Sequence, residues 1–158
     1  MTRRSSGQSC RRFSAGNPPT EVAALVDTSV LYALTDSAER QHGQCVAALS
    51  AEPEAIIVPQ PVLPEICYLV ASRLGSSKEA TFLRGLLASD WRLEPMTTQD
   101  LARTAAIMED YADAELGFVD AAITAIAERL AVKRVYTLDR RDFQLVKPAH
   151  VAAFEVLP

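Results

Sequence analysis

The chain has 158 residues, of which 49% are hydrophobic, 23% charged and 6% aromatic. A chain of this length forms one ordinary domain, with a core that needs no disulfide bonds or structural metal. Its apolar runs are too short for a membrane-spanning segment, so we expect a cytoplasmic protein. The formal net charge of −4 and the isoelectric point near 5.2 argue against binding of nucleic acid through a strong overall positive field.

The first 20 residues are basic and rich in Ser, Arg and Gly. They carry four arginines and no acidic residue, whereas the other 138 residues hold 12 basic and 20 acidic ones, a net charge of −8. No apolar segment follows the arginines, so a secretory signal peptide is excluded. We expect residues 1–20 to be a disordered tail or an upstream extension, and a basic arm that binds RNA is the alternative interpretation.

From residue 22 onward, short apolar runs alternate with stretches of helical periodicity. In chain order, we predict a strand at 22–26, a helix at 37–51, a strand at 55–58, a helix from Pro64 to Gly75, a helix at 78–89, a weak strand at 91–94, a helix from Thr97 or Thr98 to about Ala112, a helix at 118–131, a strand at 134–138 and an edge strand at 151–157. This alternation predicts an α/β domain with a mostly parallel central sheet and helices on both faces. No internal repeat or second domain is evident, so we expect 22–158 to form a single domain.

Cysteine and histidine are too sparse for most catalytic or metal-binding arrangements. Cys10, Cys45 and Cys67 form no CxxC pair, which argues against a zinc knuckle or a disulfide framework. We expect Cys67, inside an apolar stretch, to be buried as a small hydrophobic residue. His42 and His150 are isolated and are expected at the surface rather than as ligands, so a Ser-His-Asp or Cys-His site has little support.

Four acidic residues stand at positions that meet at one edge of such a sheet. Asp27 and Asp139 follow predicted strands, and Glu65 and Asp120 stand at predicted helix starts. In an open α/β sheet, the strand ends and the following helix starts share the edge at which ligands bind. Each residue also has a purely structural explanation, as a helix cap, a turn residue or an acid that complements the helix dipole.

The chemistry of a carboxylate cluster favours a divalent cation. No Lys or Arg lies close in sequence to Asp27 or Asp120, and clustered carboxylates raise one another's pKa values unless a cation compensates their charge. Oxygen ligands without His or Cys fit Mg²⁺ or Mn²⁺ and argue against Zn²⁺. Because the sequence contains neither GxGxxG nor GxxxxGK(S/T), nucleoside triphosphate hydrolysis and dinucleotide redox chemistry are disfavoured, and hydrolysis of a phosphodiester remains.

Four segments, in order and with matching spacing, resemble a known family. They are Leu25–Leu31 (LVDTSVL), Pro61–Ile66 (PVLPEI), Leu116–Ile123 (LGFVDAAI) and Tyr136–Phe143 (YTLDRRDF). On these segments the chain resembles a PIN-domain ribonuclease of the VapC toxin type. The resemblance implies a three-layer α/β/α domain and an Mg²⁺-dependent endoribonuclease that hydrolyses RNA with a carboxylate-held metal and an activated water. The basic extension before the first strand departs from the family's pattern.

The resemblance also implies roles for the acidic residues. Asp27 and Asp120 match the core metal ligands, and Glu65 completes the acidic pocket and helps to orient metal or water. Asp139 acts through water or holds a second ion. Asp142 is a second candidate near this fourth position.

Other residues near the four acids have open roles. Ser29 and Thr137 match polar positions that line such a site, although a helix cap and a strand hydroxyl explain them equally. Arg140 and Arg141 either steer the RNA backbone or are ordinary surface arginines. Asp113 is expected on a solvated face.

The resemblance further implies three partners. They are an RNA substrate of the transfer RNA or ribosomal RNA class, a cognate antitoxin that inserts near the acidic pocket, often with a basic side chain, and a second copy of the chain. The apolar faces of 37–51 and 63–74 are candidates for the homodimer interface, although core packing explains them as well. The alternative function is a non-catalytic PIN-like module that binds RNA or protein. A phosphatase or receiver-like protein that forms an aspartyl phosphate is a third interpretation, for which Lys147 is poorly placed.

Overall fold

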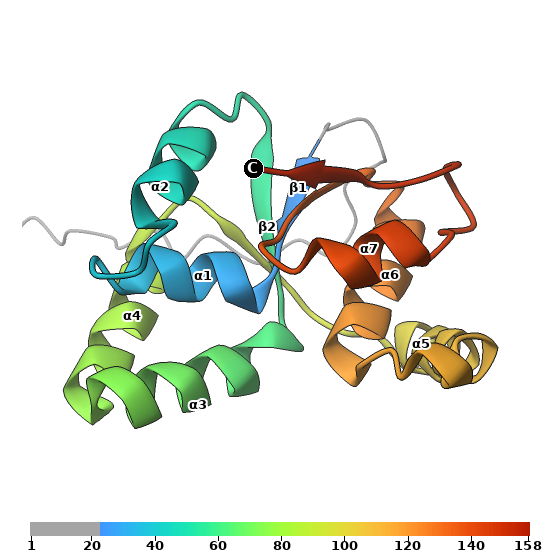
Figure 1. Ribbon diagram of the computed structural model, residues 1–158, viewed down its shortest axis with the longest axis horizontal. Coiled ribbons are helices and arrows are strands. Elements are labelled where there is room, and N and C mark those ends of the chain that lie inside the picture. Colours follow the sequence, from blue (N-terminus) through green and yellow to red (C-terminus); the bar gives the residue numbers. More distant parts are fainter. Residues whose placement is uncertain (1–22) are drawn as a thin grey trace, which may run out of the picture.

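The structure is a computed structural model that describes residues 23–158, so the predicted tail and Cys10 lie outside it. Five strands form one parallel sheet in the order β3-β2-β1-β4-β5 (Figure 1). The strands are β1 (Ala23–Val26), β2 (Ala55–Pro59), β3 (Arg92–Glu94), β4 (Arg134–Tyr136) and β5 (Glu155–Leu157). The predicted parallel sheet is confirmed, and β5 lies at an edge as expected. In the described part of the chain, no helix combines the length and the apolar composition needed to cross a membrane.

Helices lie on both sides of the sheet, so the domain has three layers (Figure 1). The helices are α1 (Thr28–Thr35), α2 (His42–Ser50), α3 (Val62–Leu74), α4 (Ser76–Ala88), α5 (Thr98–Asp110), the short 3₁₀ helix η1 (Ala112–Ala114), α6 (Phe118–Leu130) and α7 (Arg140–Leu145). Helices α1 to α4 pack against one another in one group, and α5 packs along α6 in the other. This is the three-layer α/β/α arrangement that the resemblance implies.

The central strand β1 organises the core. All four of its residues are buried, and it pairs with β2 on one side and with β4 on the other. Leu25 lies opposite Ile57 and Val135, which are equally buried, and apolar runs of this kind are typical of parallel strands covered by helices on both faces. Because the strand order reverses between β1 and β4, the carboxyl end of β1 lies at the position where such sheets usually bind ligands.

Two short helices at this edge are absent from the predicted elements. The predicted helix at 37–51 begins only at His42, and a separate helix, α1, follows β1 directly. Helix α7 follows β4 in the same way, and the predicted strand at 151–157 is reduced to Glu155–Leu157. Asp27 and Asp139 occupy the N-cap positions of the two helices. Helices of six and eight residues have too few turns for a readable apolar periodicity, so the sequence pattern does not reveal them.

Three side chains are placed differently from the predictions. Cys67 is half-buried, with Glu79 of α4 beside its thiol, and the fully buried thiol is Cys45 on α2. His42 and His150, expected at the surface, are half-buried, and a ring nitrogen of each lies 2.7 Å from a backbone carbonyl oxygen. These histidine contacts join neighbouring elements and therefore account for the burial of both rings.

Asp100 connects α5 to α6 and to the end of β3. Its side chain is almost fully buried, and its carboxylate accepts a hydrogen bond from Nε of Arg129 at 2.9 Å and shares a capping box with Thr97. Arg129 also donates to Glu94 at 2.9 Å. Burial by itself raises the pKa of Asp100, but the hydrogen bonds from Arg129 and Thr97 outweigh that effect and hold the pKa below its ordinary value.

Asp100→Asn should make the protein less stable at neutral pH and less sensitive to acid. A lowered pKa stabilises the fold above the pKa of the unfolded chain, about 3.9, and this stabilisation is lost as the pH falls through the lower pKa of the folded state. We expect the substitution to lower the free energy of unfolding by about 2 kcal/mol at pH 7 and by much less below about pH 3. Urea unfolding followed by circular dichroism across this range measures the difference. A constant difference at every pH would contradict the prediction.

Candidate active site

The carboxylate of Asp27 is the buried centre of the acidic edge. Asp27 follows β1, is only 5% exposed and accepts three hydrogen bonds from uncharged donors. Its Oδ1 accepts from the backbone N–H of Thr28 at 2.6 Å, and its Oδ2 accepts from the hydroxyls of Ser29 at 2.8 Å and Thr137 at 2.7 Å. These bonds fix the position of the carboxylate without neutralising its charge.

Thr28 connects this carboxylate to the start of α3. Its hydroxyl donates to Oε2 of Glu65 at 2.6 Å, and Glu65 lies in the first turn of α3 with its side chain exposed. Two acids that are 38 positions apart in the sequence therefore both accept hydrogen bonds from Thr28, the first residue of α1. Thr28 is not among the predicted site residues, because an Asp-Thr-Ser triplet after a strand is also typical of an ordinary helix cap.

Ser29 and Thr137 join the ends of β1 and β4. Besides its bond to Asp27, the Ser29 hydroxyl accepts from the backbone N–H of Leu138 at 2.9 Å. The Thr137 hydroxyl accepts from the backbone N–H of Asp139 at 3.0 Å. The loop that carries Asp139 is thus anchored to the same hydroxyls that hold Asp27.

Asp120 faces this network from the start of α6. It is half-buried, and its Oδ2 lies so close to Gly117 that a Cβ atom at position 117 would come within 3.1 Å of it. Burial and, to a smaller extent, the negative charges of Asp27, Asp142, Asp139 and Glu65 together raise the pKa of Asp120 to about 7. The other three predicted acids and Asp142 are therefore all close enough to act electrostatically on Asp120.

The remaining predicted residues lie around this group. Asp139 is exposed after β4, and Asp142 is half-buried in the first turn of α7. Asp113 is exposed in η1, as expected, and is not among the charges that act on Asp120. Arg140 donates a hydrogen bond to the carbonyl oxygen of Pro158, and Arg141 is exposed.

The oxygen atoms of this group fit a hard divalent cation. No ion pair among residues 23–158 involves Asp27, Glu65, Asp120 or Asp139, so their negative charges are uncompensated within the described chain. In the same residues, no group of three or more His, Cys, Asp or Glu side chains already forms a metal cage. Because the carboxylates repel one another, they accept hydrogen bonds from Thr and Ser hydroxyls and do not surround a common point. An ion that prefers carboxylate oxygens, such as Mg²⁺, matches the donors present.

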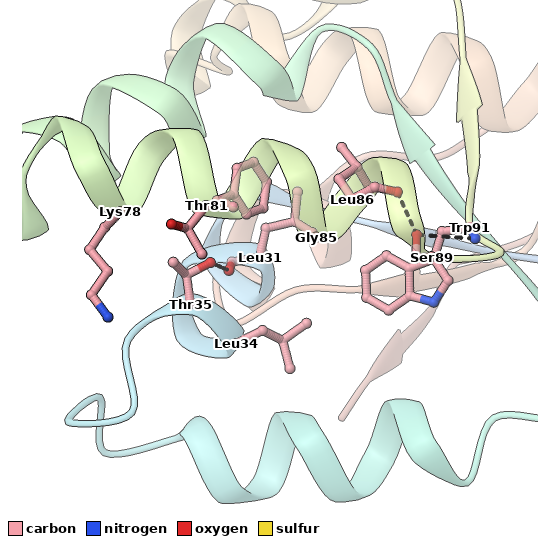
Figure 2. A pocket seen from close by; sticks show the side chains of 10 residues that line it. Leu31, Leu34, Thr35, Lys78, Thr81, Gly85, Leu86, Ser89 and Trp91 are labelled. Atoms are coloured by element: carbon pink, nitrogen blue, oxygen red, sulfur yellow. Dashed lines mark hydrogen bonds between the residues drawn. The ribbon is translucent and has the colours of Figure 1, made fainter.

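The hollow between α1 and α4 is unsuited to this chemistry. It is a cavity of about 330 Å³, and none of the four predicted acids is among its lining residues. Figure 2 shows this lining. Its apolar lining includes Leu31, Leu34, Phe82, Leu86 and Trp91. Lys78 is the only charged residue among the described ones that line it, and no carboxylate, imidazole or thiol is present there. We therefore place the reaction at the acidic edge.

Comparison with known proteins identifies the family. A family model described as PIN domain matches residues 24–147. The chain belongs to the PIN-domain family. It is 34% identical over 134 residues to ribonuclease VapC26 of Mycobacterium tuberculosis (strain ATCC 25618 / H37Rv), a match that covers 85% of this chain and 99% of the relative. The resemblance to VapC-type PIN nucleases is thus confirmed, and such nucleases generally depend on a divalent metal.

Solved structures share the PIN fold. VapC20 of Mycobacterium tuberculosis, a sarcin-ricin loop cleaving toxin, superimposes with a TM-score of 0.70 at 22% identity over 75% of this chain and 92% of that chain. VapBC2 of Rickettsia felis, bound to a promoter DNA fragment, gives a TM-score of 0.66 at 13% identity over 87% and 100% of the two chains. FitAcB of Neisseria gonorrhoeae gives 0.60 at 23% identity over 85% and 96%. At these identities, the matches establish the architecture of the PIN domain.

Thr137→Val should impair the site more than it destabilises the fold. Valine keeps the shape of the side chain but removes a hydroxyl donor to Asp27, so we expect kcat/KM for RNA cleavage to fall by about 10- to 100-fold. Thr104→Val is the matched control, because Thr104 is equally buried and its hydroxyl donates to a backbone carbonyl in α5. Steady-state cleavage kinetics compare the two variants. Equal losses in both would show that Thr137 has no special role in the site.

Proposed function

We propose that this protein is an Mg²⁺-dependent endoribonuclease that acts as the toxin of a toxin–antitoxin pair in the cytoplasm. The observation that carries the proposal is the convergence of Asp27, Glu65, Asp120 and Asp139 at one sheet edge, where none of them has an ion-pair partner among residues 23–158. Kinship with VapC26, which is named a ribonuclease, supports RNA as the substrate class. Mn²⁺ has the same preference for oxygen ligands and is the alternative ion.

In this proposal the acids hold the cation and orient the reacting groups. Asp27 and Asp120 would be the direct ligands, Glu65 would complete the pocket, and Asp139 would act through water or at a second ion. When bound, a divalent cation would lower the pKa of water and neutralise charge on a phosphodiester. Hydrolysis in this arrangement would join the oxygen of water to the phosphorus in line with the bond to the 3′ oxygen, which breaks as the 3′ oxygen takes up a proton, so the fragments would carry a 5′ phosphate and a 3′ hydroxyl.

The hydroxyl residues have a positioning role in the same proposal. Ser29 and Thr137 hold one oxygen of Asp27, and Thr28 holds one oxygen of Glu65. A carboxylate that is already fixed loses little conformational entropy when it takes up a cation. We therefore assign these three residues to preorganisation of the acids rather than to contact with RNA.

Two protein partners belong to the proposal. The first is an antitoxin that places a basic side chain near the uncompensated acids, where a cation is favoured. A solved structure with a similar fold, a toxin–antitoxin complex from Klebsiella pneumoniae, supports such a partner. The second is another copy of the chain. The apolar faces of α2 and α3 are an unsuitable interface, because Cys45, Ile66 and Val70 on these faces are fully buried in the core.

An RNA cleavage assay with total RNA tests the proposed activity. Wild type with Mg²⁺ should give discrete 5′-phosphate fragments, and EDTA should abolish them. Asp27→Asn and Asp120→Asn should each reduce the rate by at least about 100-fold, because each removes one charged ligand. Asp113→Asn is the matched control, because Asp113 is exposed and outside the acidic group; it should cut like wild type.

The outcomes separate the proposal from its alternative. Cleavage that persists in both Asp27→Asn and Asp120→Asn would overturn the assignment of the site. Binding of RNA or of a partner protein without any cleavage by wild type would favour the non-catalytic PIN-like module. Mg²⁺ should also raise the melting temperature of wild type more than that of Asp120→Asn, a readout that does not require the RNA substrate.

A further inference from the structure

Gly117 differs from the other glycines in the described part of the chain. It occupies the N-cap position of α6, three residues before Asp120. A Cβ atom at this position would lie 3.1 Å from Oδ2 of Asp120, whereas a Cβ atom at Gly43, Gly75 or Gly85 would meet no other atom within 4 Å. Among these four glycines, Gly117 is therefore the one whose missing side chain leaves space that another side chain uses.

The backbone conformation of Gly117 does not itself require glycine. Its φ of −69° and ψ of 157° lie in the extended region, which residues with side chains also adopt. Gly75 is different, since its φ of 93° lies in the left-handed region that favours glycine. A conformational reason therefore explains Gly75 but does not explain Gly117.

Capping of the helix does not explain Gly117 either. Ser, Thr, Asp and Asn are preferred at N-caps, because their side chains accept hydrogen bonds from the first N–H groups of the helix. Thr97 makes such a bond at the start of α5, whereas α6 has no bond from an N-cap side chain. Glycine thus omits a bond that would stabilise α6, and it keeps open the space beside the Asp120 carboxylate.

The Asp120 carboxylate accepts no hydrogen bond from another group of residues 23–158. Asp27 accepts three such bonds, and Glu65 accepts one from the Thr28 hydroxyl. The hydrogen bond at Asp120 involves only its backbone carbonyl oxygen, which accepts from the hydroxyl of a residue one turn further along α6. The position of this carboxylate therefore depends on the space that its neighbours leave, Gly117 among them.

We propose that Gly117 is a positioning residue, which leaves the Asp120 carboxylate the space it needs to bind Mg²⁺. The inference rests on the proposed function, in which Asp120 is a direct ligand of the cation. A side chain at position 117 would force this carboxylate to move by a few tenths of an ångström, because a Cβ contact of 3.1 Å is tighter than almost all real ones. Gly117 would then act on the cation only through Asp120.

A displacement of this size should affect small cations most. Mg²⁺ demands near-ideal octahedral geometry at about 2.0–2.1 Å from its oxygen ligands, whereas Ca²⁺ accepts flexible geometry at about 2.3–2.6 Å. Moving one carboxylate therefore weakens Mg²⁺ binding more than Ca²⁺ binding. In this way Gly117 favours the smaller ion, and the ratio of the two affinities reports on the position of Asp120 in a way that a general loss of stability would not.

Measurement of cation binding tests the role of Gly117. Electron paramagnetic resonance measures free Mn²⁺ in the presence of the full chain, and competition against Mn²⁺ gives the affinities for Mg²⁺ and Ca²⁺. Gly117→Ala should weaken Mg²⁺ binding about tenfold and Ca²⁺ binding by less than about twofold. Gly43→Ala is the matched control, because Gly43 lies in α2, which carries none of the acids, and should bind both cations like wild type.

Gly117→Ser separates the space beside Asp120 from the cap of α6. Serine adds the same Cβ atom but is a preferred N-cap residue, whereas alanine is a poor one. Without cations, Gly117→Ser should therefore melt at a higher temperature than Gly117→Ala, yet it should bind Mg²⁺ about as weakly. Wild-type affinity for Mg²⁺ in Gly117→Ser would overturn the proposal and assign the effect of alanine to the start of the helix.

Asp120→Asn distinguishes failure of this inference from failure of the proposed function. Equal Mg²⁺ affinity in wild type and Gly117→Ala, together with a loss in Asp120→Asn, would overturn the role of Gly117 and leave the proposed metal site standing. Equal losses of Mg²⁺ and Ca²⁺ affinity in Gly117→Ala would also overturn it, because they would indicate general disruption of the site. Absence of Mn²⁺ binding by wild type would overturn the proposed metal site and this inference with it.

Discussion

The buried carboxylate of Asp27 is the constraint on which the site depends. An ionised group in an apolar environment costs several kcal/mol unless hydrogen bonds offset the lost water. The offset comes from the N–H of Thr28 and the hydroxyls of Ser29 and Thr137. These donors sit at the ends of β1 and β4, so the pairing of the two strands and the orientation of the carboxylate depend on each other. The polar residues after each strand are therefore part of the fold as well as of the site.

Three acids elsewhere in the domain are paired with arginines. At the amino edge of the sheet, Glu52 and Glu54 lie 3.0 and 3.1 Å from Arg134. In the second helix layer, Asp100 is paired with Arg129. Each of these carboxylates forms an ion pair with an arginine of the chain itself, which is the usual condition for buried charge. The acids of the carboxyl edge have no such partner among residues 23–158, and this contrast supports the proposal that they hold an external cation.

The sequence predicts the parts of the molecule that depend on local pattern. The continuous apolar run of β1 predicts a buried strand, and the helical periodicity of apolar residues in α6 predicts a helix. Because strand ends and helix starts meet at one edge of a parallel sheet, the predicted elements place Asp27, Glu65, Asp120 and Asp139 at that edge. Contacts between distant elements are not readable in this way. The bond from Thr28 to Glu65 and the half-burial of Cys67 both depend on how helices are placed against each other.

The charge of the domain limits how it can hold RNA. Beyond residue 20 the chain carries a net charge of −8, and the site itself concentrates carboxylates, so a polyanion is repelled until a cation is bound. Affinity that came mainly from lysine and arginine contacts with phosphates would fall steeply with salt. At the acidic edge, the positive charge that attracts a phosphate would be that of the bound cation. Binding of RNA there would therefore depend on the same acids that hold the cation.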